Sequence, residues 1–566
     1  MKKILKKSMA LFLALLMIVP FFAISAFAED DLPESGTDYT TVLVHGLLGW
    51  GDEDRLSDLI SIWGLTSGKM PDYLRSLGYD VYVASIGPIS SAHDRCCELF
   101  AQLTGSRVDY GQAHADSCNA EYGAAGYELS HSRYGRDYTG QRKIENWGPV
   151  YDEAGKVTGW YNNKINLVGH SFGGPTAMEF VEYLAKGDEA ERNWGKEQAA
   201  LYGGDWHDYV SPLFWGDYHG EYLVNSITSL AGVLNGTTFI TANDDAMSLM
   251  TKLLMLIANT IGITDLGALY DFQLEQFGLT NIPGSDMDAR FSLLNQKGFM
   301  AGTDHAFYDL TTYGTNELKQ GWETYKNIYY FSYSCDKSYK AGGAYMPDPD
   351  MLFLLLPFSA TMGSYRDPDE VVLDLNGQKA ASIDSNWLPN DGMVNTITSR
   401  YPLGAPHQNY NVNSIASGIW NVNADLDEDH FSIVGSFLTP DPIGTRALFR
   451  KVMEDIAKTR PIADENPVSV GAMINALKAP VISSTRTTLL GKPVLDWKGV
   501  SGALKYEVYR AEDGSDYKKI DTVLLTTFTD LSAKKGKTYS YKLVAVPITA
   551  RAARSAFSLP AEVKAK

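Results

Sequence analysis

Short apolar runs alternate with longer stretches whose apolar residues recur at helical spacing. Residues 175–186 show that spacing, with Ala177, Phe180, Val181 and Leu184 on one face. Four runs predict β-strands, because they are β-branched or aromatic and end at Gly or polar residues. These runs are 41–44, 79–86, 165–169 and 327–333. Strands that alternate with helices predict an α/β fold, in which a mostly parallel sheet carries helices on both faces.

The pattern changes near the C-terminus. Residues 461–479 carry Pro and Asn punctuation and predict a linker. Beyond them, short alternating runs separated by Gly predict a small all-β sandwich of about 90 residues, similar to a fibronectin type III module. These runs are 494–497, 505–510, 526–530 and 538–543. We therefore expect a main domain over residues 29–460, a linker over 461–479 and a sandwich domain over 480–566.

The N-terminus has the pattern of a secretory signal peptide. Four Lys precede an apolar run from Met9 to Phe27, which ends in Ala26-Phe27-Ala28. This pattern predicts cleavage before Glu29 and a secreted, extracellular protein. The alternative is an uncleaved membrane anchor over the same residues.

Composition narrows the classes of partner. The 566 residues carry a formal charge of −19, which disfavours nucleic acid. The same acidity disfavours anionic membranes, so we expect any lipid contact to rest on apolar surface. Four cysteines (Cys96, Cys97, Cys118 and Cys335) are too few for a disulfide scaffold, although one or two bridges remain open.

Candidate chemistry begins at Gly169-His170-Ser171-Phe172-Gly173, which follows a predicted strand and precedes a predicted helix. That is the context of a G-x-S-x-G nucleophile elbow, in which the sharp turn exposes the Ser171 hydroxyl. The N–H of Phe172 can then face a developing oxyanion. The turn His45-Gly46-Leu47-Leu48-Gly49 follows the first strand, and its Leu47 N–H is the candidate second donor.

A nucleophile of this kind needs an acid and then a histidine further along the chain. Asp391 lies in an Asn-Asp-Gly turn, which we expect to expose its carboxylate at a strand end. The histidines that follow it are His407, in a Pro- and Asn-rich loop, and His430, which precedes apolar residues. The sequence favours His430 as the base and places His407 on the surface.

Six segments resemble the secreted zinc-containing lipases of thermophilic bacilli and staphylococci. They are VLVHGLLGWG (42–51), residues 81–114, GHSFGG (169–174), YDFQLEQFGL (270–279), TDHAFYDLT (303–311) and NDGMVNTIT (390–398). The resemblance covers residues 41 to about 458. It implies an α/β-hydrolase fold with a zinc-binding insertion and a lid, and triacylglycerol or similar ester substrates. It also implies a triad of Ser171, Asp391 and His430.

The same resemblance implies a structural Zn²⁺ site made by Asp94, His114, His131 and Asp304. Two imidazoles and two carboxylates suit a closed tetrahedral site. The spacing from His114 to His131 is longer than in the family. The family's calcium site does not transfer, because Ser432 stands where the family has a Glu ligand.

Residues 244–258 are strongly apolar and Met-rich, and we interpret them as a lid over an apolar cleft; a buried core helix is the alternative. The overall prediction is a monomeric serine carboxylester hydrolase acting on lipid esters, most specifically a triacylglycerol lipase. A phospholipase A1 or broad carboxylesterase with the same triad is the near alternative. A non-catalytic surface-binding protein is the distant one. For the role of the C-terminal module there are two alternatives: it binds cell wall, polysaccharide or another protein, or it acts as a spacer.

Overall fold

The computed structural model describes residues 35–65, 68–152, 155–243, 270–279, 287–436, 442–464, 472–500, 503–512, 517–547, 552–553, 555 and 557–566. The chain forms two compact units, one from Glu34 to Met473 and one that contains Ile474–Lys566. The division lies inside the range 461–479 expected as a linker. The exact domain limits stay a prediction, as does the signal peptide, whose residues lie outside the described part.

A seven-stranded sheet forms the centre of the first unit. Every neighbouring pair in it is parallel, which confirms the expected α/β-hydrolase sheet. The strand order is β14-β15-β9-β8-β7-β1-β2. The strands are β1 (Thr40–Val44), β2 (Val81–Val83), β7 (Ile165–His170), β8 (Val224–Leu230), β9 (Tyr329–Tyr333), β14 (His407–Asn409) and β15 (Trp420–Val422).

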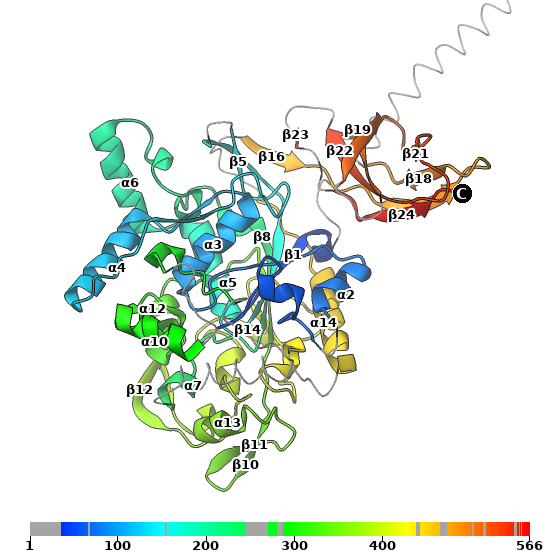
Figure 1. Cartoon of the computed structure of the whole chain (residues 1–566). Helices are drawn as coiled ribbons and strands as arrows, with labels where there is room; N and C mark the ends of the chain where they lie inside the picture. Colours follow the sequence, from blue (N-terminus) through cyan, green and yellow to red (C-terminus); the bar gives the residue numbers. More distant parts are fainter. Residues whose placement is uncertain are drawn as a thin grey trace, which may run out of the picture. The chain divides into compact units, whose positions relative to one another are not determined.

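Helices cover both faces of this sheet, because alternate residues of each buried strand point to opposite sides. Leu43 of β1 packs in one hydrophobic cluster with α2 (Met70–Ser76) and α14 (Pro442–Ala457). Its neighbours Val42 and Val44 pack in a second cluster with α3 (Ala92–Thr104) and α5 (Gly173–Lys186). Figure 1 shows α3 and α5 together and α2 beside α14. Near-continuous apolar strands such as β1 are thus explained by burial on both faces.

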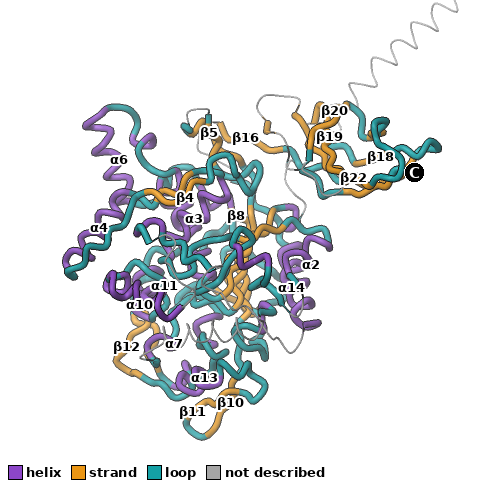
Figure 2. The backbone as a smooth tube through the Cα atoms, in the orientation of Figure 1, coloured by secondary structure: helices purple, strands orange, loops and turns teal. Residues whose placement is uncertain are grey.

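Loops connect the remaining elements of the first unit (Figure 2). The further α-helices are α4 (Gln112–Ala124), α6 (Glu189–Tyr202), α7 (Thr238–Thr241), α10 (Met287–Lys297), α11 (Ala306–Asp309), α12 (Thr312–Leu318) and α13 (Leu356–Met362). Four antiparallel hairpins or pairs are β3 (Arg107–Asp109) with β4 (Tyr134–Asp137), β5 (Pro149–Tyr151) with β6 (Val157–Tyr161), β10 (Ser338–Ala341) with β11 (Ala344–Pro347), and β12 (Asp367–Leu373) with β13 (Lys379–Ile383). The 3-10 helices include η1 (Gly36–Asp38), η2 (Arg55–Asp58), η3 (Trp206–Asp208), η4 (Pro212–Phe214), η5 (Gly220–Leu223), η6 (Glu275–Phe277), η7 (Phe299–Ala301), η8 (Ser385–Trp387), η9 (Thr396–Ser399) and η10 (Ser432–Val434).

The second unit consists mainly of two antiparallel sheets, as its alternating pattern predicts. One contains β17 (Ile482–Thr487), β18 (Pro493–Trp497) and β21 (Thr527–Thr529); the other contains β20 (Lys518–Val523), β19 (Ala503–Glu512), β22 (Thr538–Pro547) and β24 (Ala561–Lys564). Two short strands, β16 (Ala472–Ala476) and β23 (Ala552–Ala553), pair in parallel. Trp497, Tyr506, Tyr539 and Tyr541 form its core with smaller apolar residues.

The described residues contain neither a disulfide bond nor a helix suited to span a membrane. All four cysteines are buried and unpaired, which agrees with small core side chains rather than bridges. None of the described helices combines the length and the apolar character needed to cross a bilayer.

Candidate active site

Ser171 lies on a sharp turn between β7 and α5. Its φ of 57° is in the left-handed region that non-glycine residues rarely occupy. The neighbouring glycines permit this turn, because a Cβ on Gly169 would lie 2.2 Å from the carbonyl oxygen of Gly173. The strand–Ser–helix context predicted for the elbow is therefore present, with Ser171 at the carboxyl end of a central strand.

The turn after β1 lies directly against Ser171. A Cβ on Gly46 would come within 2.5 Å of the Ser171 Cβ, so only glycine allows this approach. The Leu48 N–H donates to the carbonyl of Pro88 at 2.8 Å, which fixes the far side of the turn. Among the described residues, no recorded backbone hydrogen bond occupies the N–H of Leu47 or of Phe172. Both N–H groups lie on segments next to the serine, and their role as oxyanion donors stays a prediction.

Asp391 and His430 form a buried pair. The His430 Nδ1–H donates to Asp391 Oδ2 at 2.8 Å, and the His430 backbone N–H donates to the Asp391 carbonyl at 3.0 Å. The other carboxylate oxygen, Oδ1, accepts the backbone N–H groups of Met393 at 2.9 Å and Val394 at 2.7 Å. The expectation of an exposed carboxylate was wrong, because these partners and the imidazole enclose it to 1% exposure.

His407, the rejected candidate, is exposed, as expected, but lies in the edge strand β14 instead of a loop.

His170 connects this pair to the elbow. Its Nε2–H donates to the carbonyl oxygen of His430 at 2.9 Å, and the two rings lie 4.8 Å apart. Burial, with the charge of His430 second, holds the pKa of His170 well below its usual range, so the ring is a neutral donor. The residue before Ser171 is therefore hydrogen-bonded to the backbone of His430, which brings the three predicted catalytic segments together.

Arg95 braces the turn after β1 from the protein interior, and the sequence did not single it out. Its guanidinium is fully buried and donates to the carbonyls of His45 and Gly87 and, at 3.0 Å, to the Thr176 hydroxyl of α5. It also lies 4.8 Å from the centre of the Phe172 ring. One side chain thus ties together the two segments that carry the oxyanion donors.

Burial shifts the pKa of two titratable groups near Arg95. Burial, and then the nearby Arg95 charge, lower the pKa of His45 to about 3, so that imidazole is neutral. Burial, and then the charge of Asp94, raise the pKa of Glu98 to about 8. The Glu98 carboxyl accepts the Gly87 N–H and, at 3.0 Å, the Tyr110 hydroxyl. The loop at Gly87 is therefore held from both its N–H and its carbonyl by α3.

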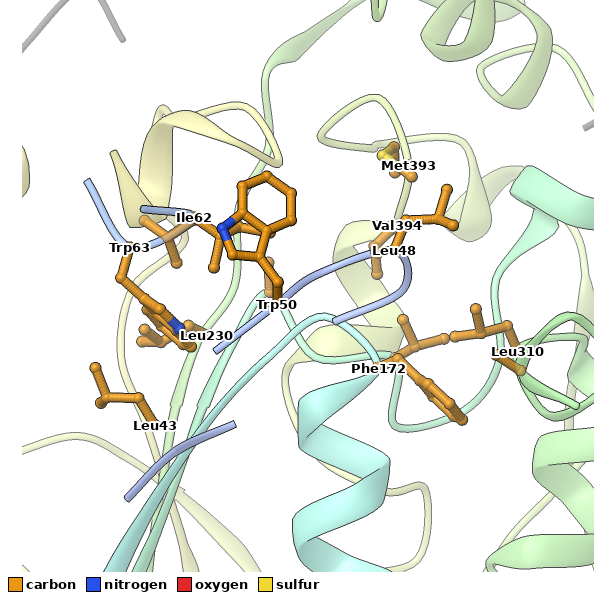
Figure 3. Packing of buried hydrophobic residues seen from close by; sticks show 14 of the residues in the cluster. Leu43, Leu48, Trp50, Ile62, Trp63, Phe172, Leu230, Leu310, Met393 and Val394 are labelled. Carbon is orange, nitrogen blue, oxygen red and sulfur yellow. The ribbon is translucent and has the colours of Figure 1, made fainter. Parts of the chain in front are cut away.

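Apolar side chains from separate segments surround the elbow. Leu48, Phe172 and Val394 belong to one buried cluster although they come from the turn after β1, the elbow and the loop after Asp391. Figure 3 shows Leu48 beside Val394, and Phe172 facing Leu310. Such packing excludes water from the neighbourhood of the reacting groups.

The four predicted metal ligands form one cluster. They come from α3 (Asp94), α4 (His114), the loop before β4 (His131) and the loop before α11 (Asp304), and their ligand atoms all lie within 4.8 Å of one another. His131 Nε2 is 3.3 Å from Asp94 Oδ2, and His114 Nε2 is 3.5 Å from an oxygen of each aspartate. A tetrahedron with bonds of about 2.0 Å has edges of about 3.3 Å, so the set fits Zn²⁺.

Buried polar atoms in the cluster also fit a metal. Asp94 Oδ1 and both Asp304 carboxylate oxygens are buried and have no hydrogen-bond partner among the described residues. Such carboxylates are costly unless a cation compensates them. The residues between His114 and His131 form most of α4 and a loop that returns to the cluster. Asn119 of α4 makes two hydrogen bonds with the His131 backbone, which hold this loop in place.

Two further predictions concern the region of the family's calcium site and the lid. The Ser432 hydroxyl donates to Glu428 at 2.5 Å, and the Asp94 cluster is the only candidate metal group among the described residues. Residues 244–258 lie outside the described part of the chain, so the lid stays a prediction.

Comparisons with known proteins show the family of the chain. Residues 37–466 match the family described as "Lipase-like, C-terminal domain". The chain is 30% identical to "Lipase 1" of Staphylococcus aureus over 430 residues, which are 75% of this chain and 55% of that protein. The chain thus spans about half the length of the curated relatives it matches.

Two solved structures are similar over the first unit. Lipase 1 from Pelosinus fermentans has a TM-score of 0.59 and 33% identity, and the match covers 75% of this chain and 100% of that one. EstA from Clostridium botulinum has a TM-score of 0.61 and 27% identity, with 77% and 90% covered.

Proposed function

Because the chain belongs to the lipase-like family matched over residues 37–466, we propose that it is a serine carboxylester hydrolase, most specifically a triacylglycerol lipase. The observation that carries this proposal is the link from His170 through His430 to Asp391. It joins an elbow, a histidine and a buried acid, and the acid precedes the histidine in the chain as in α/β-hydrolases. The family membership supports the lipid ester as substrate.

In the proposed mechanism, Ser171 Oγ attacks the ester carbonyl and His430 Nε2 takes its proton. Asp391 keeps the proton of the imidazole on Nδ1 and stabilises the imidazolium that forms. The N–H groups of Leu47 and Phe172 bind the oxyanion of the tetrahedral intermediate. His430 then protonates the leaving alcohol, and water hydrolyses the acyl-enzyme by the same steps.

The Asp94, His114, His131 and Asp304 cluster is proposed to hold a structural Zn²⁺. The ion would supply positive charge between two buried carboxylates and hold four separate segments together. No step of the hydrolysis passes through it. Metal analysis of purified protein tests this assignment, and less than about half an equivalent of zinc would contradict it.

The predicted signal peptide at residues 1–28 supports a secreted, extracellular enzyme, and we expect a monomer.

The decisive test of the catalytic assignment compares Ser171→Ala with wild type. The variant should lose essentially all hydrolysis of p-nitrophenyl esters and all labelling by a fluorophosphonate. Substantial remaining turnover would contradict the assignment. Emulsified triacylglycerol beside phosphatidylcholine then separates a lipase from a phospholipase A1.

A further inference from the structure

The net charge of the protein is unevenly divided between its two units. Residues 34–473 contain 29 Lys and Arg against 57 Asp and Glu, whereas residues 474–566 contain 16 against eight. The acidity that disfavours anionic partners therefore belongs to the hydrolase unit alone. The C-terminal module has a charge of +8 and is suited to an anionic partner.

One end of the module combines apolar and basic side chains, and we call it the Leu–Lys end. It consists of Leu489, Leu490, Lys492, Lys535 and Lys566, which line a hollow of about 410 Å³. Backbone hydrogen bonds hold its segments together, since the Lys566 N–H donates to the Gly491 carbonyl at 3.0 Å. This end includes the turn between β17 and β18, and Figure 1 marks the chain end close to β18 and β24.

The leucines of this end are fully presented to solvent. Leu489 is 107% exposed and Leu490 is 85% exposed, at the tip of a tight turn. Two adjacent leucines at a turn tip contribute nothing to the core and carry a cost in water. Such a pair can instead insert into the acyl region of a lipid layer.

The lysines around the leucines are available for a partner. Lys535 and Lys566 line the hollow with the leucines, and Lys534 precedes Lys535 in the chain. All three are exposed, and the structure records no ion pair for them among the described residues. Lys537 is different, because Glu512 neutralises it at 3.2 Å. Unpaired lysines that line one hollow with exposed leucines match the two layers of an anionic lipid surface, with charged headgroups above acyl chains.

We propose that the Leu–Lys end docks the protein on anionic lipid surfaces. Leu489 and Leu490 enter the interface while Lys535 and its neighbours contact the headgroup phosphates. This binding is independent of the proposed hydrolysis, because it uses no residue of the first unit. An anionic soluble polymer would use the lysines but leave the leucines without a role.

The test is sedimentation of the full chain with vesicles of phosphatidylcholine, with and without phosphatidylglycerol. Ser171→Ala serves as the parent so that the lipid stays intact, and its binding also separates this proposal from the catalytic one. We expect binding to the mixed vesicles that weakens with salt, and little binding to phosphatidylcholine alone. Equal binding to both vesicles would overturn the proposal.

Matched variants locate the contact. Leu489→Ser with Leu490→Ser should weaken binding about tenfold or more, and Lys534→Gln with Lys535→Gln about fivefold for each lysine. The control is Leu524→Ser with Leu525→Ser, an equally exposed pair (72% and 70%) in the turn between β20 and β21, which should bind as the parent does.

In the Ser171→Ala background, the two leucine double variants should unfold at the same temperature as the parent, which shows that the fold is kept. Equal loss in both leucine pairs would remove the Leu–Lys end as the site. Loss in the lysine variant alone, with full competition by soluble polyphosphate, would assign the surface to an anionic polymer and overturn the lipid proposal.

Discussion

Replacing Asp391 by Asn should disable the proposed base while leaving the fold intact. Asp391 Oδ1 accepts two backbone N–H groups, from Met393 and Val394, so the one amide oxygen of Asn must stay at that position. The amide NH₂ then faces His430 Nδ1, which becomes an acceptor. The imidazole proton moves to Nε2, the atom that has to take the proton of the serine.

The expected loss is roughly 10⁴-fold in kcat, or about 5 kcal/mol of transition-state stabilisation, from the wrong tautomer alone. The assay is steady-state hydrolysis of a water-soluble p-nitrophenyl ester near neutral pH, with thermal unfolding measured on the same samples. KM should change little. A loss below about tenfold in a folded variant would refute the role given to Asp391.

Asp429 provides a matched control, because it precedes His430 and is buried without contacting the imidazole. Its carboxylate accepts the backbone N–H groups of Leu352, Phe431 and Ser432. Asp429→Asn should therefore cost about 1–3 kcal/mol of stability but less than tenfold in kcat of the folded protein. An equal loss of kcat in both variants would mean that general disruption, and not the tautomer, explains the result.

Three further predictions follow from other buried groups. Arg95→Met removes the brace of the oxyanion turn and should lower kcat about 10- to 100-fold with little change in KM; unchanged kcat would contradict the brace. Chelation should lower the midpoint of thermal unfolding by several degrees, and Asp304→Asn should lose that response, as calorimetry can show. Burial lowers the pKa of Lys319 to about 7, and its ammonium donates to the amide oxygen of Asn235 at 3.1 Å. The free-energy cost of burying its charge is full below pH 7 and fades toward pH 10. Lys319→Met should therefore be more stable than wild type at pH 6 and lose this advantage as the pH rises. Denaturant unfolding at each pH measures the difference.

The sequence was sufficient where the signal is local. The elbow is encoded within residues 165–186, as an apolar strand, two glycines around Ser171 and an amphipathic helix. In this fold the acid and then the histidine follow the nucleophile along the chain. That order left two histidines after Asp391 as candidate bases, His407 and His430. The structure adds the hydrogen bonds that join these segments, which come from positions up to 260 residues apart.

Strand β8 could not be predicted, because polar residues interrupt its apolar pattern. Asn225, Ser226, Thr228 and Ser229 are nonetheless fully buried. Asn225 and Ser226 donate to the side-chain oxygen of Asn166 on the neighbouring strand β7, each at 2.8 Å. Their partners come from another strand, so burial becomes favourable only after the sheet has formed. The predicted strand at 79–86 was too long, because only Val81–Val83 pair with β1 in the sheet.

Helix α3 explains why a metal cluster belongs to this catalytic unit. Asp94 faces the cluster, while the next residue, Arg95, holds the carbonyl of His45, and Glu98 one turn later holds the Gly87 N–H. Adjacent residues on a helix point about 100° apart, so one rigid element can serve two neighbouring sites. Uncompensated Asp94 and Asp304 would repel each other and strain the start of α3, and that strain would reach the oxyanion turn through Arg95. A cation bound to this cluster would therefore stabilise more than the inserted segment that supplies His114 and His131. It would also hold α3, whose Arg95 donates to the His45 carbonyl in the turn that carries Leu47.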